Sequence, residues 1–171
     1  MPGFLRLLVV IFVVALLPYN SSQAAQAFSR SQAFGDWVLN CTKDNDPNVK
    51  STERCSLQQK LITDKGDRLV VINIIKIPDV KEKLALFTLP LGFYIPDGVE
   101  ITIDSGKPRR LLIAYCVQVG CVAQISLEKK LFKQMSAGKK LKVRLVTHNR
   151  AKKLEFIMSL KGISAGIKAV N

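Results

Sequence analysis

The fold class of this chain is decided by the stretch Tyr115-Cys116-Val117-Gln118-Val119-Gly120-Cys121-Val122. Two apolar runs flank a four-residue connection that contains a glycine, which is typical of a β-hairpin. In a hairpin with a connection of this length, Cys116 and Cys121 face each other across the strands, within bridging distance. The stretch therefore predicts two antiparallel strands joined by a short turn.

On both sides of this hairpin, the chain consists of short apolar or alternating segments separated by turn residues. Asp64-Lys65-Gly66-Asp67 and Asp104-Ser105-Gly106-Lys107-Pro108 are two such turns, because Gly, Asp and Pro favour tight connections. The predicted strands cover residues 34–41, 54–63, 68–77, 84–89, 99–103, 111–117, 121–127, 141–147 and 154–160. About nine short strands with regular turns favour an all-β sandwich, either immunoglobulin-like or jelly-roll-like.

Two segments depart from the strand pattern. In residues 128–137, Leu131, Phe132 and Met135 fall at helical spacing and Gly138 can end the turn, so we expect a short helix there. Residues 162–170 are apolar with small side chains, which indicates one short helical turn. The expected architecture is therefore a β-sandwich with a short helix near 128–137.

The first 27 residues have the pattern of a cleaved export signal. Leu7 to Leu17 is an uninterrupted apolar run, Pro18 interrupts it, and Ala25-Gln26-Ala27 provides a small-residue cleavage site. The run is shorter than the roughly 20 residues that a helix needs to cross a bilayer. We therefore expect residues 1–27 to be removed and residues 28–171 to fold as a single domain in the periplasm; an uncleaved membrane anchor is the alternative.

Four cysteines, Cys41, Cys55, Cys116 and Cys121, remain after removal of the leader. An even set in an oxidising compartment favours two disulfides. Three pairings are possible, and sequence position favours the local one, Cys41–Cys55 with Cys116–Cys121. Zinc is a weaker alternative, because thirteen and four residues separate the cysteines of each pair, whereas a four-cysteine knuckle has two to four in both. A redox-active C-x-x-C pair is absent from the sequence.

Positive charge is concentrated in the C-terminal half. Residues 28–171 contain 25 of the 26 Lys and Arg residues, since only Arg6 lies in the leader, together with all 13 Asp and Glu residues. From Lys129 to Lys153 there are ten basic residues and no acidic one. Such a segment attracts anionic surfaces such as lipopolysaccharide, phospholipid headgroups, sulfated glycans or nucleic acid; the alternative is a solvated face that keeps the protein soluble.

The candidate residues for binding an anionic envelope or host-cell surface are Lys129, Lys130, Lys133, Lys139, Lys140, Lys142 and Arg144. Alternation along a strand predicts that Lys140, Lys142 and Arg144 share its exposed side. Peripheral membrane association would follow from such a face. The low aromatic content, 7%, argues against a stacking platform for single-stranded nucleic acid, so we expect no specific nucleic-acid partner.

Signals of catalysis are weak. His148 is the single histidine, in a predicted turn, and no serine or cysteine nucleophile has a recognisable setting. Asp44 and Asp46 lack the glycine and glutamate that follow them in a calcium-binding EF-hand loop. We therefore expect a non-enzymatic protein with no cofactor and no metal site.

The residues resemble those of the invasion-associated locus B proteins of alphaproteobacteria. The resemblance covers nearly all of residues 28–171 in the expected order, and no single motif is diagnostic. It is carried by Phe34-Gly35-Asp36-Trp37, the four cysteines, Leu57-Gln58-Gln59, Leu89-Pro90-Leu91-Gly92, Gly98-Val99, Ile101-Thr102-Ile103-Asp104, Gly120, Ala123, Ser159-Leu160-Lys161-Gly162 and Ala165.

The resemblance implies an exported protein, periplasmic or associated with the outer membrane, with an immunoglobulin-like β-sandwich. Members of the family take their name from a role in bacterial entry into host cells, although many relatives belong to bacteria with no invasive habit. The resemblance carries no catalytic or cofactor residues, and the shared positions are structural. The residues and the resemblance together favour an envelope or host-interaction protein with a basic surface. The second function class is a periplasmic binding or inhibitor module that docks on a protein, and a role in envelope maintenance unrelated to invasion is a further alternative. A third class, an enzyme, requires a pocket that brings His148 together with carboxylates.

Overall fold

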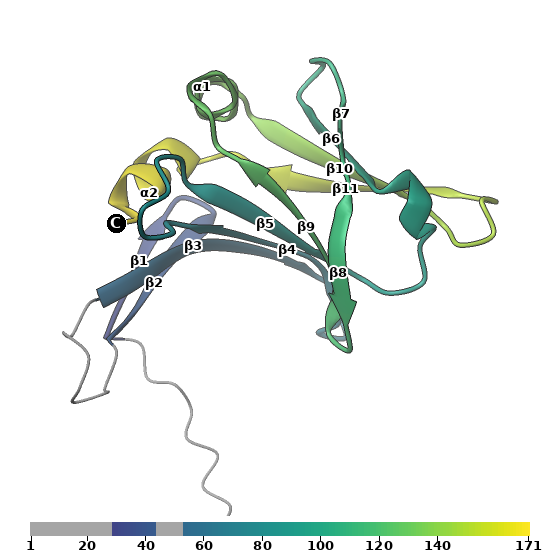
Figure 1. The fold of residues 1–171 in the computed structure, drawn as a ribbon, viewed down its shortest axis with the longest axis horizontal. Coiled ribbons are helices and arrows are strands. Elements are labelled where there is room, and N and C mark those ends of the chain that lie inside the picture. The colour runs from purple at the N-terminus through teal and green to yellow at the C-terminus, as the bar shows by residue number, and fades with distance from the viewer. Residues whose placement is uncertain (1–28, 44–52) are drawn as a thin grey trace, which may run out of the picture.

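The computed structural model describes residues 29–43 and 53–171 of the chain. Within them, two antiparallel β-sheets and two short α-helices form one structure (Figure 1). The predicted leader, residues 1–27, and the residues Asp44 and Asp46 lie outside the described residues. Neither helix in the described part of the chain has the length and apolarity needed to cross a membrane.

The larger sheet has seven strands in the order β1-β2-β3-β4-β5-β9-β8, so that most neighbours in space are also neighbours in sequence. Consecutive hairpins of this kind need only short turns, which the Gly- and Asp-containing connections supply. Its strands are β1 (Arg30–Phe34), β2 (Trp37–Lys43), β3 (Glu53–Ile62), β4 (Arg68–Ile75), β5 (Leu84–Leu89), β8 (Ile113–Val117) and β9 (Gly120–Ser126).

The smaller sheet has four strands in the order β11-β10-β6-β7. They are β6 (Val99–Ile103), β7 (Arg109–Leu111), β10 (Lys140–Val146) and β11 (Lys153–Ser159). The 3-10 helix η1 (Ile95–Asp97) precedes β6, α1 (Lys129–Ala137) connects β9 to β10, and α2 (Ile163–Ala169) follows β11. In Figure 1 the smaller sheet lies above the larger one, and α2 lies beside β1 and β2.

One continuous apolar core lies between the two sheets. The larger sheet contributes side chains such as Trp37, Leu57 and Phe87, and the smaller sheet contributes side chains such as Ile101 and Val143, all of them almost fully buried. Alternate residues of each strand supply this core, as the period of two in a strand requires. The prediction of an all-β sandwich with a short helix near 128–137 is therefore confirmed.

The first predicted strand, residues 34–41, is wrong in its extent. Phe34 ends β1 and pairs with Trp37, the first residue of β2, so Gly35 and Asp36 form a two-residue hairpin turn. Gly35 has a φ of +58°, a conformation that glycine adopts without steric cost. The five residues of β1 are mostly exposed, so they show no apolar alternation that would have revealed the strand.

The predicted strand over residues 111–117 is also wrong in its extent, because the chain changes sheets within it. Leu111 ends β7 in the smaller sheet, Ile113 begins β8 in the larger sheet, and Leu112 between them is 72% exposed. The described residues therefore form eleven strands, more than the predicted nine or so. The other predicted strands form with shifts of no more than two residues at their ends.

The two ends of the described domain meet through residues that carried the family resemblance. The Trp37 indole Nε1 on β2 donates a hydrogen bond to the Ser159 carbonyl on β11 at 3.0 Å. The amide of Gln59, on β3, donates to that same carbonyl at 3.1 Å and to the Asp36 carbonyl at 3.0 Å. Gly162 (φ +88°) lies so close to Phe34 that a Cβ would be 2.0 Å from the Phe34 oxygen. These contacts tie the two sheets together.

Candidate functional site

Both predicted disulfides are present, and each joins two residues that lie directly opposite each other on neighbouring strands. Cys41 on β2 pairs with Cys55 on β3, with 4.0 Å between the Cα atoms, and both are buried. Cys116 on β8 pairs with Cys121 on β9, with 3.9 Å between the Cα atoms. Cys116 is exposed at the edge of the sheet, whereas Cys121 is buried.

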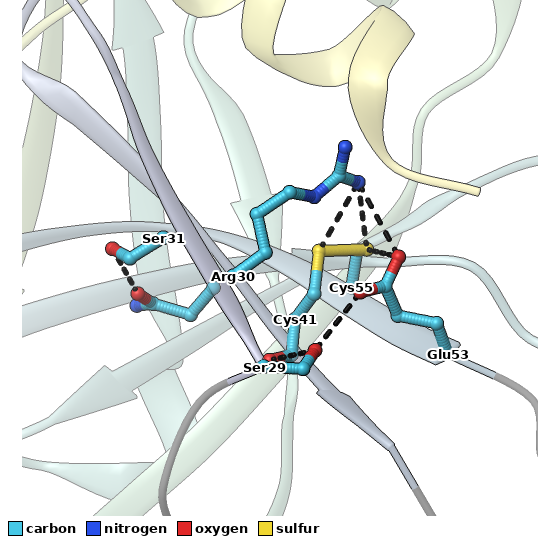
Figure 2. Close-up of a disulfide and its surroundings, with 7 residues drawn as sticks. Ser29, Arg30, Ser31, Cys41, Glu53 and Cys55 are labelled. Atoms are coloured by element: carbon cyan, nitrogen blue, oxygen red, sulfur yellow. Dashed lines mark hydrogen bonds and ion pairs between the residues drawn. A yellow bond between two sulfur atoms is a disulfide. The ribbon is translucent and has the colours of Figure 1, made fainter.

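The polar side chains of Ser29, Arg30 and Glu53 lie beside the buried disulfide (Figure 2). The Arg30 guanidinium lies 3.5 Å from the Cys41 sulfur and 3.5 Å from the Glu53 carboxylate, with which it forms an ion pair. The Ser29 hydroxyl donates a hydrogen bond to the other oxygen of this carboxylate at 2.9 Å. Cys41, Cys55 and Glu53 are close enough to suggest a metal site, but the bridge uses both sulfurs, so neither is the thiolate that zinc binds.

The candidate lysines of α1 lie on its solvent-facing side. Leu131 and Met135, one turn apart, are buried against the core, whereas Lys129, Lys130 and Lys133 are exposed. The amphipathic pattern that predicted the helix thus also places these ammonium groups on the side of α1 that faces solvent. None of the three forms an ion pair within the described residues.

On β10 the alternation places Lys140, Lys142 and Arg144 on the outer face of the smaller sheet, opposite the buried Leu141 and Val143. This arrangement was predicted from the sequence. The chain enters β10 directly from α1, through Gly138 and Lys139. The backbone N–H groups of Lys139 and Lys140 donate hydrogen bonds to the Asp104 carboxylate, which holds this entry in place.

Arg144 differs from the other candidate residues because two carboxylates flank it. Glu100 on β6 and Glu155 on β11 are its partners across the two neighbouring strands, and the guanidinium forms an ion pair with each at 2.5 Å. The hydrogen bond that it donates to Glu155 raises the pKa of Arg144 above its ordinary value. The ammonium groups that β10 presents without an ion pair in the described residues are therefore those of Lys140 and Lys142.

The structure adds three lysines that the sequence reasoning did not select. Lys81 and Lys83 precede β5 and Lys168 lies on α2, and all three line a cleft together with Lys129. The Lys83 ammonium donates a hydrogen bond to the Ile167 carbonyl at 2.6 Å. Burial of this group, with a smaller contribution from Lys76, lowers the pKa of Lys83. These residues lie far apart in sequence, so no local pattern could have grouped them.

His148 lies exposed in the turn between β10 and β11. Its imidazole has no hydrogen bond or ion pair to a carboxylate within the described residues. The neighbouring Arg150 stacks on the Tyr94 ring, with its guanidinium carbon 4.1 Å from the ring centroid. The turn is therefore held by a cation–π contact, and it does not position His148 against a partner that would make it a general base.

Comparison with known proteins gives consistent matches. The family model described as "Invasion associated locus B (IalB) protein" matches residues 37–171. Invasion protein B of Bartonella bacilliformis is 22% identical over 131 residues, which is 76% of this chain and 64% of that relative. The crystal structure of invasion associated protein B from Bartonella henselae superposes with a TM-score of 0.69 at 22% identity, covering 82% of this chain and 93% of that one. That likeness supports the two-sheet fold.

Proposed function

Because this chain belongs to the invasion associated locus B family, we propose that it is an exported, non-enzymatic envelope protein that contributes to host-cell interaction. Its lysine-rich surface, which we define as Lys129, Lys130, Lys133, Lys139, Lys140 and Lys142, would bind an anionic envelope or host-cell surface. The curated relative is named an invasion protein, and this chain spans 64% of that relative's length. The proposal that this chain binds an anionic surface therefore rests on its own residues.

The observation that carries the proposal is that the ammonium groups of the lysine-rich surface form no ion pairs within the described residues. Each of its six lysines is at least partly exposed, and none forms an ion pair within residues 29–43 and 53–171. Positive charge without internal partners attracts anions, and a lysine close to an anionic membrane contributes about 1 kcal/mol. Several such lysines supply enough free energy for peripheral binding.

We further propose that the leader directs the chain to the periplasm, with association to the outer membrane or release from the cell as later steps. The four cysteines support an oxidising destination, because disulfides persist in the periplasm and outside the cell. Cell fractionation, with the N-terminus of the mature protein sequenced, tests this proposal. A protein retained in the cytoplasm with residues 1–27 intact would contradict it.

The binding proposal is tested with the mature protein on heparin and on phosphatidylcholine vesicles with and without phosphatidylglycerol. We expect the protein to bind heparin and the vesicles that contain phosphatidylglycerol, and not the vesicles of phosphatidylcholine alone. The affinity should fall steeply as the salt concentration rises, because salt screens exposed charges. The variant Lys139→Gln/Lys140→Gln/Lys142→Gln should lose on the order of 100-fold in affinity at low salt, at about 1 kcal/mol per lysine.

The matched control removes three charges from a hairpin of the larger sheet. Lys60→Gln/Lys65→Gln/Arg68→Gln changes exposed residues of the β3–β4 hairpin and alters the net charge by the same amount. An equal loss in both triple variants would mean that net charge alone drives binding, and it would contradict a defined surface.

A second function class, a periplasmic module that binds a protein, is favoured by the β8–β9 hairpin. Residues 111–127 contain no charged side chain, and Tyr115, Val117 and Val119 are 54%, 49% and 63% exposed. β8 is an end strand of its sheet, and an uncharged edge can accept an added strand. The partner in this alternative is an extended, uncharged segment of another protein.

The variant Val117→Lys tests this second class by placing a charge on the β8 edge. Ile157→Lys is the control, because Val117 on β8 and Ile157 on β11 are both 49% exposed and each lies on an end strand of its sheet. In cells, we expect the crosslinked product between the β8 edge and its partner protein to disappear in Val117→Lys and to persist in Ile157→Lys. Identical crosslinking patterns in the two variants would remove the β8 edge from consideration. Sedimentation of the pure protein shows whether the added strand comes from a second copy.

A further inference from the structure

A cleft with an apolar floor and a basic rim opens between the segment before β5, the start of α1 and the end of α2. Its volume is about 290 Å³. The floor consists of Leu127, Phe132 and Ile167, and the rim carries Lys81, Lys83, Lys129 and Lys168 beside one acidic residue, Glu82. Four lysines around an apolar surface with a single carboxylate make the cleft basic.

The rim lysines play two different roles. Lys83 is half-buried and donates its hydrogen bond to the Ile167 carbonyl at the end of α2, so it fixes one wall of the cleft. Lys81, Lys129 and Lys168 are exposed, and their ammonium groups have no partner within the described residues. Three ammonium groups thus remain free to contact a ligand.

The apolar floor explains what else such a ligand must contain. Leu127 is 7% and Ile167 is 4% exposed, and Phe132 packs against the core with part of its ring accessible. An apolar chain laid on this floor would be removed from water, which favours its binding. A purely ionic ligand would gain nothing from the floor, and a purely apolar one would gain nothing from the rim.

We propose that this cleft binds an anionic amphiphile, a single aliphatic chain that ends in a carboxylate or phosphate group. The chain would lie along Leu127, Phe132 and Ile167, and the anionic end would lie among Lys81, Lys129 and Lys168. The cleft is at the small end of the range for ligand sites, about 300–1,000 Å³, so it accommodates one short chain or part of a longer one. The site is distinct from the lysine-rich surface in its requirement for an aliphatic chain, although Lys129 belongs to both.

Calorimetry with decanoate as the probe tests the proposal, with decanol and decyltrimethylammonium for comparison. We expect decanoate to bind more tightly than either, and amide shifts in NMR spectra to change at α1, α2 and the segment before β5. The variant Lys81→Gln/Lys168→Gln should weaken decanoate about tenfold, at two- to fivefold for each exposed charge. Phe132→Ala, checked for folding by circular dichroism, should weaken decanoate through the lost apolar contact.

The control variant is Lys65→Gln/Lys161→Gln, which removes the same charge from exposed positions outside the cleft and should change decanoate affinity less than twofold. Equal affinity of decanoate for the two double variants would overturn the proposal, and so would shift changes confined to other elements.

The source of the amphiphile is distinguished with anionic vesicles. Weaker vesicle binding in Lys81→Gln/Lys168→Gln than in the charge-matched Lys65→Gln/Lys161→Gln indicates a membrane lipid. Equal vesicle binding in these two variants, with weaker decanoate binding in the first, indicates a free acid. The variant Lys139→Gln/Lys140→Gln/Lys142→Gln changes no residue that lines the cleft, so its effect on heparin binding tests the lysine-rich surface separately from the effect of the cleft variants on decanoate.

Discussion

At the scale of single residues, two glycines allow the ends of the domain to meet. A Cβ on Gly35 would lie 2.5 Å from the Lys161 carbonyl oxygen, and one on Gly162 would lie 2.0 Å from the Phe34 oxygen. Both glycines also have positive φ angles, where a side chain is strained. The turn before β2 and the turn before α2 therefore contact each other through backbone atoms.

Gly162→Ala is expected to lower the free energy of unfolding by about 3 kcal/mol or more, because the methyl group meets backbone that cannot move aside. Gly66→Ala is the matched control, since its φ is +87° and nothing lies within 4 Å of the added Cβ. It should cost only the left-handed penalty of about 1–2 kcal/mol. Urea unfolding of both variants measures the difference, and equal costs would contradict close contact at Gly162.

The lowered pKa of Lys83 leads us to expect that the stability of the protein depends on pH. The pKa of this lysine is lowered from 10.5 in the folded protein, so the unfolded chain holds more protons once the pH exceeds this lowered value. The free energy of unfolding contributed by Lys83 should therefore rise as the pH increases toward 10.5. The free energy of unfolding is measured against pH up to 10.5 in the wild type and in two variants. Lys83→Met should lack the rise in this free energy, and Lys76→Met should show a smaller rise because Lys76 contributes to the lowered pKa. An identical pH profile in Lys83→Met would contradict the burial effect.

At the scale of elements, the two disulfides join neighbouring strands at different depths. Cys41–Cys55 connects β2 to β3 in the core, whereas Cys116–Cys121 connects β8 to β9 at an exposed edge. Their loops also differ, with sequence separations of 14 and 5 residues. Longer loops lose more entropy on closure in the unfolded chain, so the two bridges should not stabilise the domain equally.

Replacing Cys41 and Cys55 together by alanine is expected to cost at least about 3 kcal/mol, since loop entropy and buried packing are both lost. Replacing Cys116 and Cys121 should cost about 2 kcal/mol, because that loop is shorter and one sulfur is exposed. Unfolding in urea without reductant compares the two double variants. A greater loss from the edge pair would show that the hairpin at β8 holds the sheet together more than burial indicates.

At the scale of the whole molecule, the Ser159 carbonyl joins the two sheets. It lies on β11 and accepts hydrogen bonds from Trp37 on β2 and Gln59 on β3. Either donor alone leaves this acceptor with a partner. Loss of both leaves a carbonyl unpaired between the sheets, and an unpaired buried acceptor costs about 1–3 kcal/mol.

A double-mutant cycle with Trp37→Phe and Gln59→Leu is expected to show a loss in the double variant that exceeds the sum of the single losses by at least about 1 kcal/mol. The single variants each retain one donor to Ser159, and the cycle cancels the volume change at each site. The free energies are measured by urea unfolding. Strict additivity would mean that water replaces the missing donors and that the carbonyl is not enclosed.

Much of the fold could be predicted because the signals are local. Strands such as β5 and β6 bury every second residue, so their apolar alternation matches their bounds. The disulfide pairing could be predicted for a related reason. Both bridges link strands that are adjacent along the chain and pair with each other in the sheet. The strand β1 was missed because its exposed residues carry no such alternation.

The sequence by itself determined most of the strand and turn pattern, the short helix and the outward direction of the lysines on α1 and β10, since each depends on periodicity within one segment. It favoured the two local bridges because the paired cysteines lie close together along the chain. Only the tertiary structure decided which segments meet: the change of sheet at Leu112, the two carboxylates beside Arg144 and the cleft that gathers Lys81, Lys129 and Lys168. The physical reason is that periodicity records which face of a segment is buried, whereas contacts between distant segments depend on how the two sheets and the helices pack.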